Sequence, residues 1–356
     1  MGVIVTRAWT RDWSSPLRRP LRTAGGDVTE RRGVMVALED SEGHVAWGES
    51  SPLPGFSIET QKASRAALER IVAPSSPLFH RSWSDVQAVE TGLMAFDVPP
   101  SARHALDQAL LGLLATTRAI SVPRLLSDNP LRAVRVHRLV ADEAEANVAL
   151  SEGVRCVKVK VGRDAPAADI RRVRRIRKIM GDEAIIRLDA NGAWSLPVAV
   201  ETLAALEEVS LGCVEEPVAD RDLQSMAALR RRLSIPIAAD ESMRTMADLR
   251  RIIALGAADV VVIKPMLVGG LTAGLSLARH ALSAGLEVYV TTTIDASVAR
   301  WGALFLASAL GKSRVHGLDT GAFLRQDVGS GPLACGGVMR VELDSVELPN
   351  HPREAA

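Results

Sequence analysis

The apolar and polar positions along the chain divide it into two parts. In the first hundred residues, VMVALEDSEGHVAWGES alternates as two strands with a turn at 41–43, and IETQKASRAALERIVA has helical spacing. A further helix is predicted over residues 102–116, after the break made by Pro99 and Pro100. We therefore expect residues 1–120 to form an α+β capping domain that carries active-site loops.

From residue 134 onward, short apolar strands alternate with amphipathic helices. The eight predicted strands are VRVHRLV, CVKVKVG, AIIRLDA, LGCVEEP, IPIAAD, ADVVVIK, LEVYVTTT and VHGLD. Such alternation indicates parallel strands, and eight of them indicate a closed βα barrel. The expected fold class is therefore α/β, a modified TIM barrel over residues 121–320, with residues 321–356 packing back on the capping domain.

Composition and charge exclude several classes of protein. The chain has 43 Lys and Arg against 42 Asp and Glu, so a net charge of +1 gives no reason to expect nucleic acid or a membrane surface as a partner. The basic run RRVRRIRK at 171–178 carries Val173 and Ile176 at helical spacing, which predicts the solvated face of an amphipathic helix.

Cysteine usage and hydropathy point to a reducing compartment. Cys156, Cys213 and Cys335 are widely separated and form no CxxC pair, which excludes a disulfide framework and a zinc site. The N-terminus lacks the apolar region of a signal peptide, and no run of 18 apolar residues could span a membrane. We expect a cytoplasmic protein; its oligomeric state stays open.

Charged residues end five consecutive predicted strands. Lys160, Asp189, Glu215, Asp240 and Lys264 follow one another at intervals of 29, 26, 25 and 24 residues, each about one strand-plus-helix repeat. In a βα barrel the chemistry lies where the strands end, at the C-terminal face. These five side chains are therefore expected to be neighbours around the barrel mouth.

Three carboxylates in one cavity repel each other unless a cation lies between them. Hard oxygen ligands select Mg2+, or Mn2+, over Zn2+. We therefore predict that Asp189, Glu215 and Asp240 are metal ligands. The alternative is that each acid only caps the helix that follows its strand.

Two lysines share one face of the second predicted strand. The strand period of two places Lys158 and Lys160 together, opposite Val157, Val159 and Val161. Two ammonium groups in the lumen are expected to lower each other's pKa, so that one lysine can act as a base near neutral pH. With Lys264 approaching from the other side, this arrangement suits removal of a proton α to a metal-chelated carboxylate.

Five motifs then resemble a known family. KVKVG, RLDANGAW, CVEEP, AADES and VIKPMLVGG, in this order, resemble the muconate-lactonizing-enzyme subgroup of the enolase superfamily over almost the whole chain. The resemblance implies that Lys160 is the base, that Lys158 assists it and that Lys264 faces both across the substrate. It implies Mg2+ at Asp189, Glu215 and Asp240, with Asn191 and Glu241 supporting the lysines and metal ligands.

Other segments narrow the resemblance to o-succinylbenzoate synthases, enzymes of menaquinone biosynthesis. GESSPLPGFSIET is similar to the loop that covers their active site, so Gly55 and Phe56 are expected to contact substrate; the alternative is a rigid surface turn. TTTID and HGLDT are similar to the strand ends that receive a succinyl carboxylate, which implies contacts from Thr291, Thr293 and Gly317. The implied activity is a carbon–oxygen lyase reaction on a small carboxylate with a succinyl arm.

Departures from the family pattern weigh against other activities. The seventh predicted strand lacks the histidine base of mandelate racemases, and Gly317-Leu318-Asp319 stands where dipeptide epimerases show Asp-x-Asp. An N-succinylamino acid racemase, another activity of the subgroup, or a binding protein without catalysis remain alternatives. The segment 21–33 is expected to be a mobile loop over the site, hinged at Gly25-Gly26, with Arg22 or Thr23 setting specificity; a solvated hairpin is the alternative.

Overall fold

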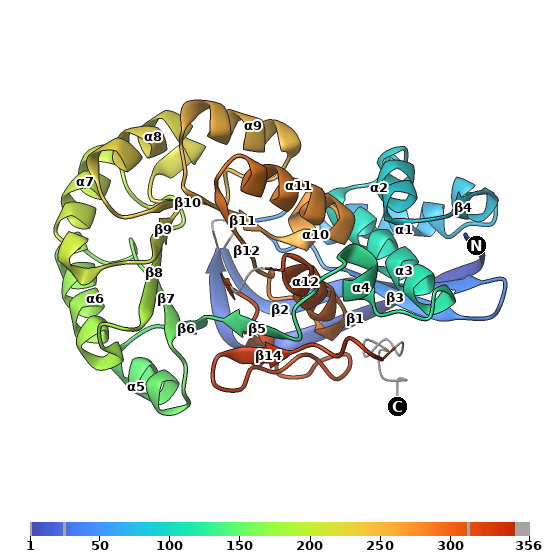
Figure 1. Ribbon diagram of the computed structural model, residues 1–356, viewed down its shortest axis with the longest axis horizontal. Coiled ribbons are helices and arrows are strands. Elements are labelled where there is room, and N and C mark those ends of the chain that lie inside the picture. Colours follow the sequence, from blue (N-terminus) through green and yellow to red (C-terminus); the bar gives the residue numbers. More distant parts are fainter. Residues whose placement is uncertain (1, 24–25, 312–313, 346–356) are drawn as a thin grey trace.

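The N-terminal part is built on two long antiparallel strands. The computed structural model describes residues 2–23, 26–311 and 314–345. Strands β1 (Val3–Thr23) and β2 (Gly26–Asp40) pair along most of their length and are flanked by β3 (Val45–Ser50) and β4 (Ser82–Trp83), in the order β3-β2-β1-β4. Figure 1 shows this ribbon running from the small domain towards the ring of strands.

Helices cover one face of this sheet and supply its core. They are α1 (Gln61–Ile71), η1 (Pro77–His80), α2 (Val86–Met94), α3 (Pro100–Thr117) and α4 (Val122–Leu126). Helix α3 is apolar on nearly every side, because it packs on the sheet and on the barrel at once; Leu106, Leu110 and Leu113 are fully buried. The predicted hairpin at 41–43 and the helix over 102–116 are both confirmed.

Seven parallel strands form most of a ring. They are β6 (Arg138–Val140), β7 (Cys156–Lys160), β8 (Ile185–Asp189), β9 (Cys213–Glu215), β10 (Ile237–Ala239), β11 (Val260–Ile263) and β12 (Glu287–Val290), each bonded to the next. Strand β13 (Val315–His316) closes the ring, because it pairs with β5 (Ala133–Val136) and Gly317 N donates to Val290 O over 2.8 Å. The first predicted strand is thus divided at His137 into β5 and β6.

Helices surround this ring on the outside (Figure 1). They are α5 (Glu143–Ser151), α6 (Pro166–Met180), α7 (Leu196–Ala204), α8 (Leu223–Arg232), α9 (Met246–Leu255), α10 (Pro265–Val268), α11 (Leu271–Ser283) and α12 (Ser297–Ala309), with 3-10 turns η2 (Glu207–Val209) and η3 (Ala219–Arg221). Among the described residues, no α-helix follows strand β13, which leads to the 3-10 turn η4 (Gly321–Phe323) and then to another strand, so the barrel is modified at its last repeat. The predicted fold class is confirmed.

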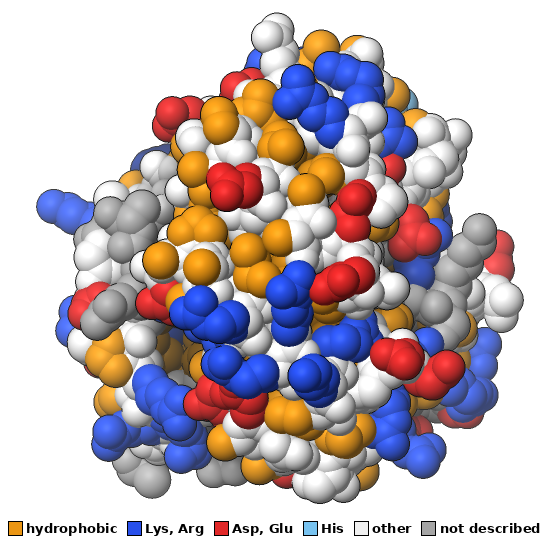
Figure 2. All heavy atoms as spheres, turned by 90° about the vertical axis from the view of Figure 1, so that its left-hand side faces the viewer, with side chains coloured by type: hydrophobic (Ala, Val, Ile, Leu, Met, Phe, Trp, Pro, Cys, Tyr) orange, Lys and Arg blue, Asp and Glu red, His pale blue; other side chains and the backbone are white. Residues whose placement is uncertain are grey.

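The basic run at 171–178 lies on α6 as expected. Val173 and Ile176 are fully buried against the barrel, whereas Arg171, Arg174 and Arg175 are exposed. Figure 2 shows the face made by the outer helices, where basic and acidic side chains are mixed with apolar ones. The arginines are therefore the solvated face of an amphipathic helix.

The described residues of segment 21–33 pair as antiparallel strands, which favours the alternative, a hairpin, over the mobile loop that was expected, and Leu21 lines the candidate cavity. These residues belong to β1 and β2, where Leu21 pairs with Val28, and a register shift separates this pair from Pro16. The polar sequence forms strands because each one has the other as a hydrogen-bonding partner. Gly25 and the side chains of Arg22 and Thr23 lie outside the described residues, so the hinge and specificity hypotheses stay predictions.

The segment after residue 320 contacts both parts of the chain. Arg325 N donates to Pro16 O over 2.9 Å in β1, whereas β14 (Val338–Arg340) pairs with β5 of the barrel. Residues 346–356 lie outside the described residues, and the domain boundaries at 120 and 320 stay predictions. In the part of the chain that the structure describes, no helix is long and apolar enough to cross a membrane.

Buried charges of the capping domain hold the barrel helices. Asp107 on α3 accepts from Leu271 N (2.6 Å) and Thr272 N (3.3 Å) at the start of α11. Glu49 on β3 accepts from Ala296 N and Ala299 N, both over 2.9 Å, at the start of α12. Each carboxyl therefore caps a helix of the other domain.

Asp107→Asn tests the charge at this contact. Burial raises the pKa of Asp107 to about 7, well above its value in an unfolded chain, so folding takes up a proton between about pH 4 and 7. The free energy of unfolding should fall as pH rises through this window, by up to about 1.4 kcal/mol per pH unit from this group. Urea unfolding at pH 5, 6 and 7 should show a flatter dependence in the variant.

The matched control is Asp85→Asn. Asp85 caps α2 from an exposed position, where Ala88 N donates to Oδ1 over 2.8 Å, and its pKa is lowered, chiefly by that bond. Because Asp85 is ionised across the whole window, this variant should keep the wild-type slope. An unchanged slope in Asp107→Asn would mean that Asp107 is ionised in the folded protein.

Candidate active site

Lysines and carboxylates from neighbouring strands meet at the C-terminal end of the barrel. Lys158 Nζ lies 3.0 Å from Asp189 Oδ2 and 3.1 Å from Glu215 Oε2. Lys160 Nζ lies 3.0 Å from the same Asp189 oxygen, and Lys264 Nζ lies 2.7 Å from Asp240 Oδ2. The structure therefore brings together all six residues predicted as lysine and metal-ligand positions.

The pKa of Lys158 is shifted in the direction opposite to the one expected from the sequence. Burial works to lower the pKa of Lys158, but Asp189 and Glu215 outweigh it and raise that pKa above its usual value. The expected mutual lowering of the two lysine pKa values therefore fails for Lys158. The reason is that its nearest charges are carboxylates of the next two strands rather than the other lysine.

Two side chains position Lys160. Its Nζ donates to Asn191 Oδ1 over 2.6 Å, and Asn191 Nδ2 donates to Glu241 Oε1 over 3.0 Å. Asn191 has a φ of 46°, a left-handed conformation in which Asn is tolerated better than most residues. Asn191 thus contacts Lys160 directly, and Glu241 contacts it through Asn191. The supporting role that the resemblance implies for both residues stays a prediction.

Glu216 fixes the next loop, a role that the sequence did not reveal. Its Oε2 accepts from Asp240 N (3.0 Å) and Ser242 N (3.2 Å), and its Oε1 accepts from the Ser242 hydroxyl. These bonds hold the backbone that carries Asp240 and Glu241. The two adjacent acids in CVEEP were the available signal. Successive residues of a strand point in opposite directions, so if Glu215 faces the lumen, Glu216 points away from it and is available to the loop.

The donor set fits a divalent cation. Asp189 Oδ1 and Glu215 Oε1 are buried and have no hydrogen-bond partner among the described residues, which leaves one oxygen on each carboxylate free for a ligand. In the described chain, no three acidic, His or Cys side chains converge in a metal-binding arrangement, and Lys158 Nζ lies between the two carboxylates instead. The role of Asp189, Glu215 and Asp240 as metal ligands stays a proposal.

A cavity of about 470 Å3 opens over these residues. The lysines and Asp189 form its floor, and Gly55 and Phe56 of the capping domain line its edge. The Phe56 ring centre lies 4.9 Å from Lys264 Nζ. Phe56 N and Ser57 N both donate to Leu53 O, at 3.0 and 2.8 Å, and Gly55 has a φ of 79°. The loop is therefore a tight turn that also covers the cavity.

The cavity wall opposite the carboxylates comes from β12, β13 and β6. Thr291, Thr293 and Gly317 line this wall, as do His137 and Leu139. The Thr291 hydroxyl donates to Gly317 O over 2.7 Å, and the Thr293 hydroxyl donates to Asp295. The three predicted substrate contacts thus lie in the cavity, although both threonine protons already have partners in the protein.

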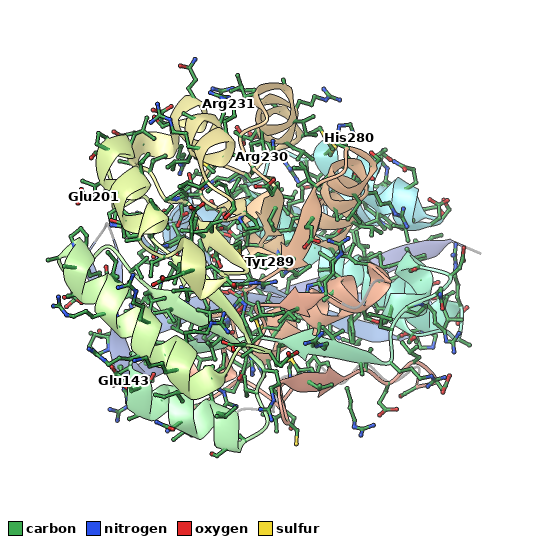
Figure 3. The ribbon with its side chains drawn as sticks, turned by 60° about the vertical axis from the view of Figure 1, so that its left-hand side comes forward. Glu143, Glu201, Arg230, Arg231, His280 and Tyr289 are labelled. Carbon is green, nitrogen blue, oxygen red and sulfur yellow. The ribbon has the colours of Figure 1, made fainter. Side chains whose placement is uncertain are left out.

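A buried polar group beneath the site was also missed. The Arg187 guanidinium lies 4.3 Å from the Tyr289 ring centre, and Tyr289 lies at the centre of the ring of strands (Figure 3). Figure 3 places the other labelled residues, Glu143, Glu201, Arg230, Arg231 and His280, on the outer helices. Burial and Glu215 raise the pKa of Tyr289 well above 10. The strand period was the available signal, because Arg187 precedes Asp189 by two residues.

The family of the chain follows from its sequence matches. Residues 140–351 match the family described as Enolase C-terminal domain-like, which is more than half of the chain. The chain belongs to the enolase superfamily. Residues 12–96 match a second family, described as MenC, N-terminal domain. The first match includes the strands that carry the candidate site. The second match includes most of the N-terminal sheet and the turn at Gly55 and Phe56.

Relatives with several activities resemble the chain. An o-succinylbenzoate synthase of Mycolicibacterium smegmatis is 34% identical, over 68% of this chain and 73% of that protein. An N-succinylamino acid racemase of Thermus thermophilus is 31% identical, over 83% and 80%. A dipeptide epimerase structure from Methylococcus capsulatus, solved with Mg and a dipeptide, has a TM-score of 0.83 at 26% identity, over 96% and 98%. These similarities leave the reaction open.

Mg2+ titration tests the ligand set. Asp189→Asn and Glu215→Gln each remove a negative charge and alter a carboxylate that has an unpartnered oxygen. Each should weaken Mg2+ binding about tenfold or more, because even substitutions of residues that only support metal ligands have effects of this size. Isothermal titration calorimetry would measure the affinity. Glu201→Gln, on the exposed outer face of α7, is the control and should bind as wild type does. Equal affinities in all four proteins would reject these two ligands.

Proposed function

We propose that the protein dehydrates 2-succinyl-6-hydroxy-2,4-cyclohexadiene-1-carboxylate to o-succinylbenzoate, an Mg2+-dependent step of menaquinone biosynthesis. The observation that carries this proposal is the position of Lys160 and Lys264. Lys160 lies on β7 and Lys264 directly follows β11. The three strands that carry the carboxylates lie between β7 and β11, so the two lysines approach one cavity from different sides. A synthase relative at 34% identity supports the same reaction.

Lys160 is the proposed base. Its Nζ, held by Asn191 and Asp189, takes the proton from the carbon that bears the ring carboxylate. The ring hydroxyl then leaves with that proton as water, and the ring becomes aromatic. Because one nitrogen both accepts and returns the proton, the two groups must leave from the same face of the ring.

Lys264 is the proposed electrostatic partner. Burial works to lower its pKa, but Asp240 and Glu241 outweigh burial and raise it, so Lys264 is an ammonium at neutral pH. A fixed, buried positive charge stabilises the negative charge that develops on the substrate carboxylate. When bound at Asp189, Glu215 and Asp240, Mg2+ would supply further stabilisation as a Lewis acid.

The opposite wall supports an anionic arm rather than a dipeptide. A dipeptide carries an ammonium group, which needs a free carboxylate in the cavity. Asp319 is the acid on this wall among the described residues, and Arg138 Nε lies 3.3 Å from its Oδ2. Because Arg138 holds Asp319 in an ion pair that it shares with Glu152, Asp319 is not free to receive an ammonium group.

Turnover assays with single-lysine variants test the function. Purified protein with Mg2+ should convert the cyclohexadiene substrate, followed by its ultraviolet absorbance, and Lys160→Ala should lower kcat about a thousandfold or more, since proton transfer is lost. Lys264→Ala should also be slow. Lys178→Ala, on the exposed side of α6, is the control and should keep wild-type turnover.

Two further assays separate the alternatives. Racemisation of N-succinylamino acids requires both lysines, one on each face of the substrate, as acid and base, so racemisation without dehydration would identify the racemase. Epimerisation of dipeptides without either activity would identify an epimerase and reject the succinyl arm. Absence of all three activities in folded, Mg2+-binding protein would reject the proposed function.

The covering loop gives a further prediction. Phe56→Ala should lower kcat/KM about tenfold, because a phenyl group that covers bound substrate is worth about 1.5–3 kcal/mol when buried. Ile58 belongs to the same loop and is 74% exposed, so Ile58→Ala should change kcat/KM by less than about twofold, as expected for a surface position. If both substitutions changed kcat/KM equally, Phe56 would be a residue of the turn that does not contact substrate.

A further inference from the structure

The topology leaves one wall of the cavity for the rest of the substrate. The carboxylates come from β8, β9 and the end of β10, and the lysines come from β7 and β11 on either side of them. The remaining strands around the ring are β12, β13 and the β5–β6 pair. If the reacting carboxylate lies at the acids, as the proposed function requires, the succinyl arm points to this wall.

Hydrogen-bond donors are scarce on this wall. The hydroxyls of Thr291 and Thr293 donate to Gly317 O and Asp295, and one of the Thr292 and Thr320 hydroxyls donates to the other over 2.7 Å, which leaves the second proton of that pair as a further candidate donor. The arm of the substrate ends in a carboxylate, which requires donors. The ring of His137, at the junction of β5 and β6, also lines this wall, and unlike the carboxylate of Asp319 it can offer an N–H donor.

The environment of His137 fixes its tautomer. Arg187 Nη1 lies 3.2 Å from His137 Nδ1, and a guanidinium can only donate. Nδ1 therefore accepts, and the proton of the neutral ring is on Nε2. Burial, followed by Lys158 and Arg187, lowers the pKa of His137 well below 6.5, in agreement with a neutral ring.

The His137 ring lines the cavity, and its Nε2 faces Gly317. A Cβ placed on Gly317 would lie 2.6 Å from Thr291 Oγ1 and only 2.9 Å from His137 Nε2, so these three residues meet at one point of the wall. A side chain on Gly317 would collide with His137. Because Gly317 has no side chain, room is left beside Nε2. The Tyr289 ring, whose centre lies 6.1 Å from that of His137 at an interplanar angle of 75°, packs against the imidazole.

We propose that His137 is a substrate-binding residue, whose Nε2–H donates a hydrogen bond to the terminal carboxylate of the succinyl arm. Arg187 is then a positioning residue, because it holds the acceptor nitrogen of His137 and also donates to Val315 O over 2.9 Å. The inference rests on the proposed function, since it takes the succinyl arm from there. A neutral donor with a fixed proton suits an ionised acceptor, because such charge-assisted bonds are the stronger ones.

Ligand binding tests this contact without turnover. With the Mg2+-loaded protein, Kd is measured for o-succinylbenzoate and for 2-butanoylbenzoate, which keeps the ring carboxylate and the ketone but lacks the terminal carboxylate. His137→Phe should raise the first Kd about tenfold or more, the loss expected for one hydrogen bond to a charged group. The second Kd should change by less than about twofold, as expected where no bond is lost.

Three comparisons make the result specific. His137→Gln keeps one acceptor and one N–H donor, so it should recover part of the affinity for o-succinylbenzoate. His280→Gln, on the exposed face of α11 (Figure 3), is the control and should bind both ligands as wild type does. In wild-type protein with 15N-labelled histidine, His137 should carry its proton on Nε2, and o-succinylbenzoate alone should shift that resonance.

Several outcomes would overturn the inference. Equal losses for both ligands in His137→Phe would assign the ring to the shape of the cavity or to the ketone. A proton on Nδ1 in the wild-type spectrum would contradict the tautomer, even if the variants failed to fold. If wild-type protein bound neither ligand, the proposed function would be rejected and this inference with it, whereas normal wild-type binding with an unaffected variant would reject the inference alone.

Discussion

The compensation of buried negative charge at the barrel mouth is the constraint on which the site depends. Asp189, Glu215 and Asp240 end adjacent strands and are almost fully buried, so each needs a positive neighbour or a bound cation. The lysines meet this need from both sides of the acids. In the proposed function, catalysis and stability therefore use the same ion pairs, because Asp189 pairs with both Lys158 and Lys160.

The capping domain meets a related constraint with buried groups of its own. Arg31 is 1% exposed, and its guanidinium donates to Ser51 O, Pro52 O and Ile294 O. One side chain thus joins the base of the covering loop to the loop after β12. Because Glu49 and Asp107 cap α12 and α11 nearby, the lid is fixed relative to the wall of the cavity. A rigid lid loses little entropy when substrate binds.

The sequence predicted what depends on local periodicity and missed what depends on partners. The strands and the charged strand ends were visible because parallel strands alternate with helices and each repeat has nearly constant length. The raised pKa of Lys158 was not predictable, since it depends on distances to acids two strands away. Residues 21–33, which belong to the β1–β2 ribbon, were expected to form a loop. They are polar, and their partner strand β1 contains two prolines, so the pairing could not be seen from either strand alone.

The same distinction explains why the motifs identify a superfamily but not a reaction. In the proposed mechanism, the lysines and carboxylates serve the removal of a proton α to a carboxylate, a first step that would be common to a synthase, a racemase and an epimerase. What differs is the remainder of the substrate, and this part meets β12, β13 and the β5–β6 junction. On that wall the sequence shows only a glycine, threonines and a histidine, none of which forms a motif. Their proposed role comes from the contacts among them: Gly317 leaves room beside Nε2 of His137, and Arg187 donates to Nδ1 of the same ring.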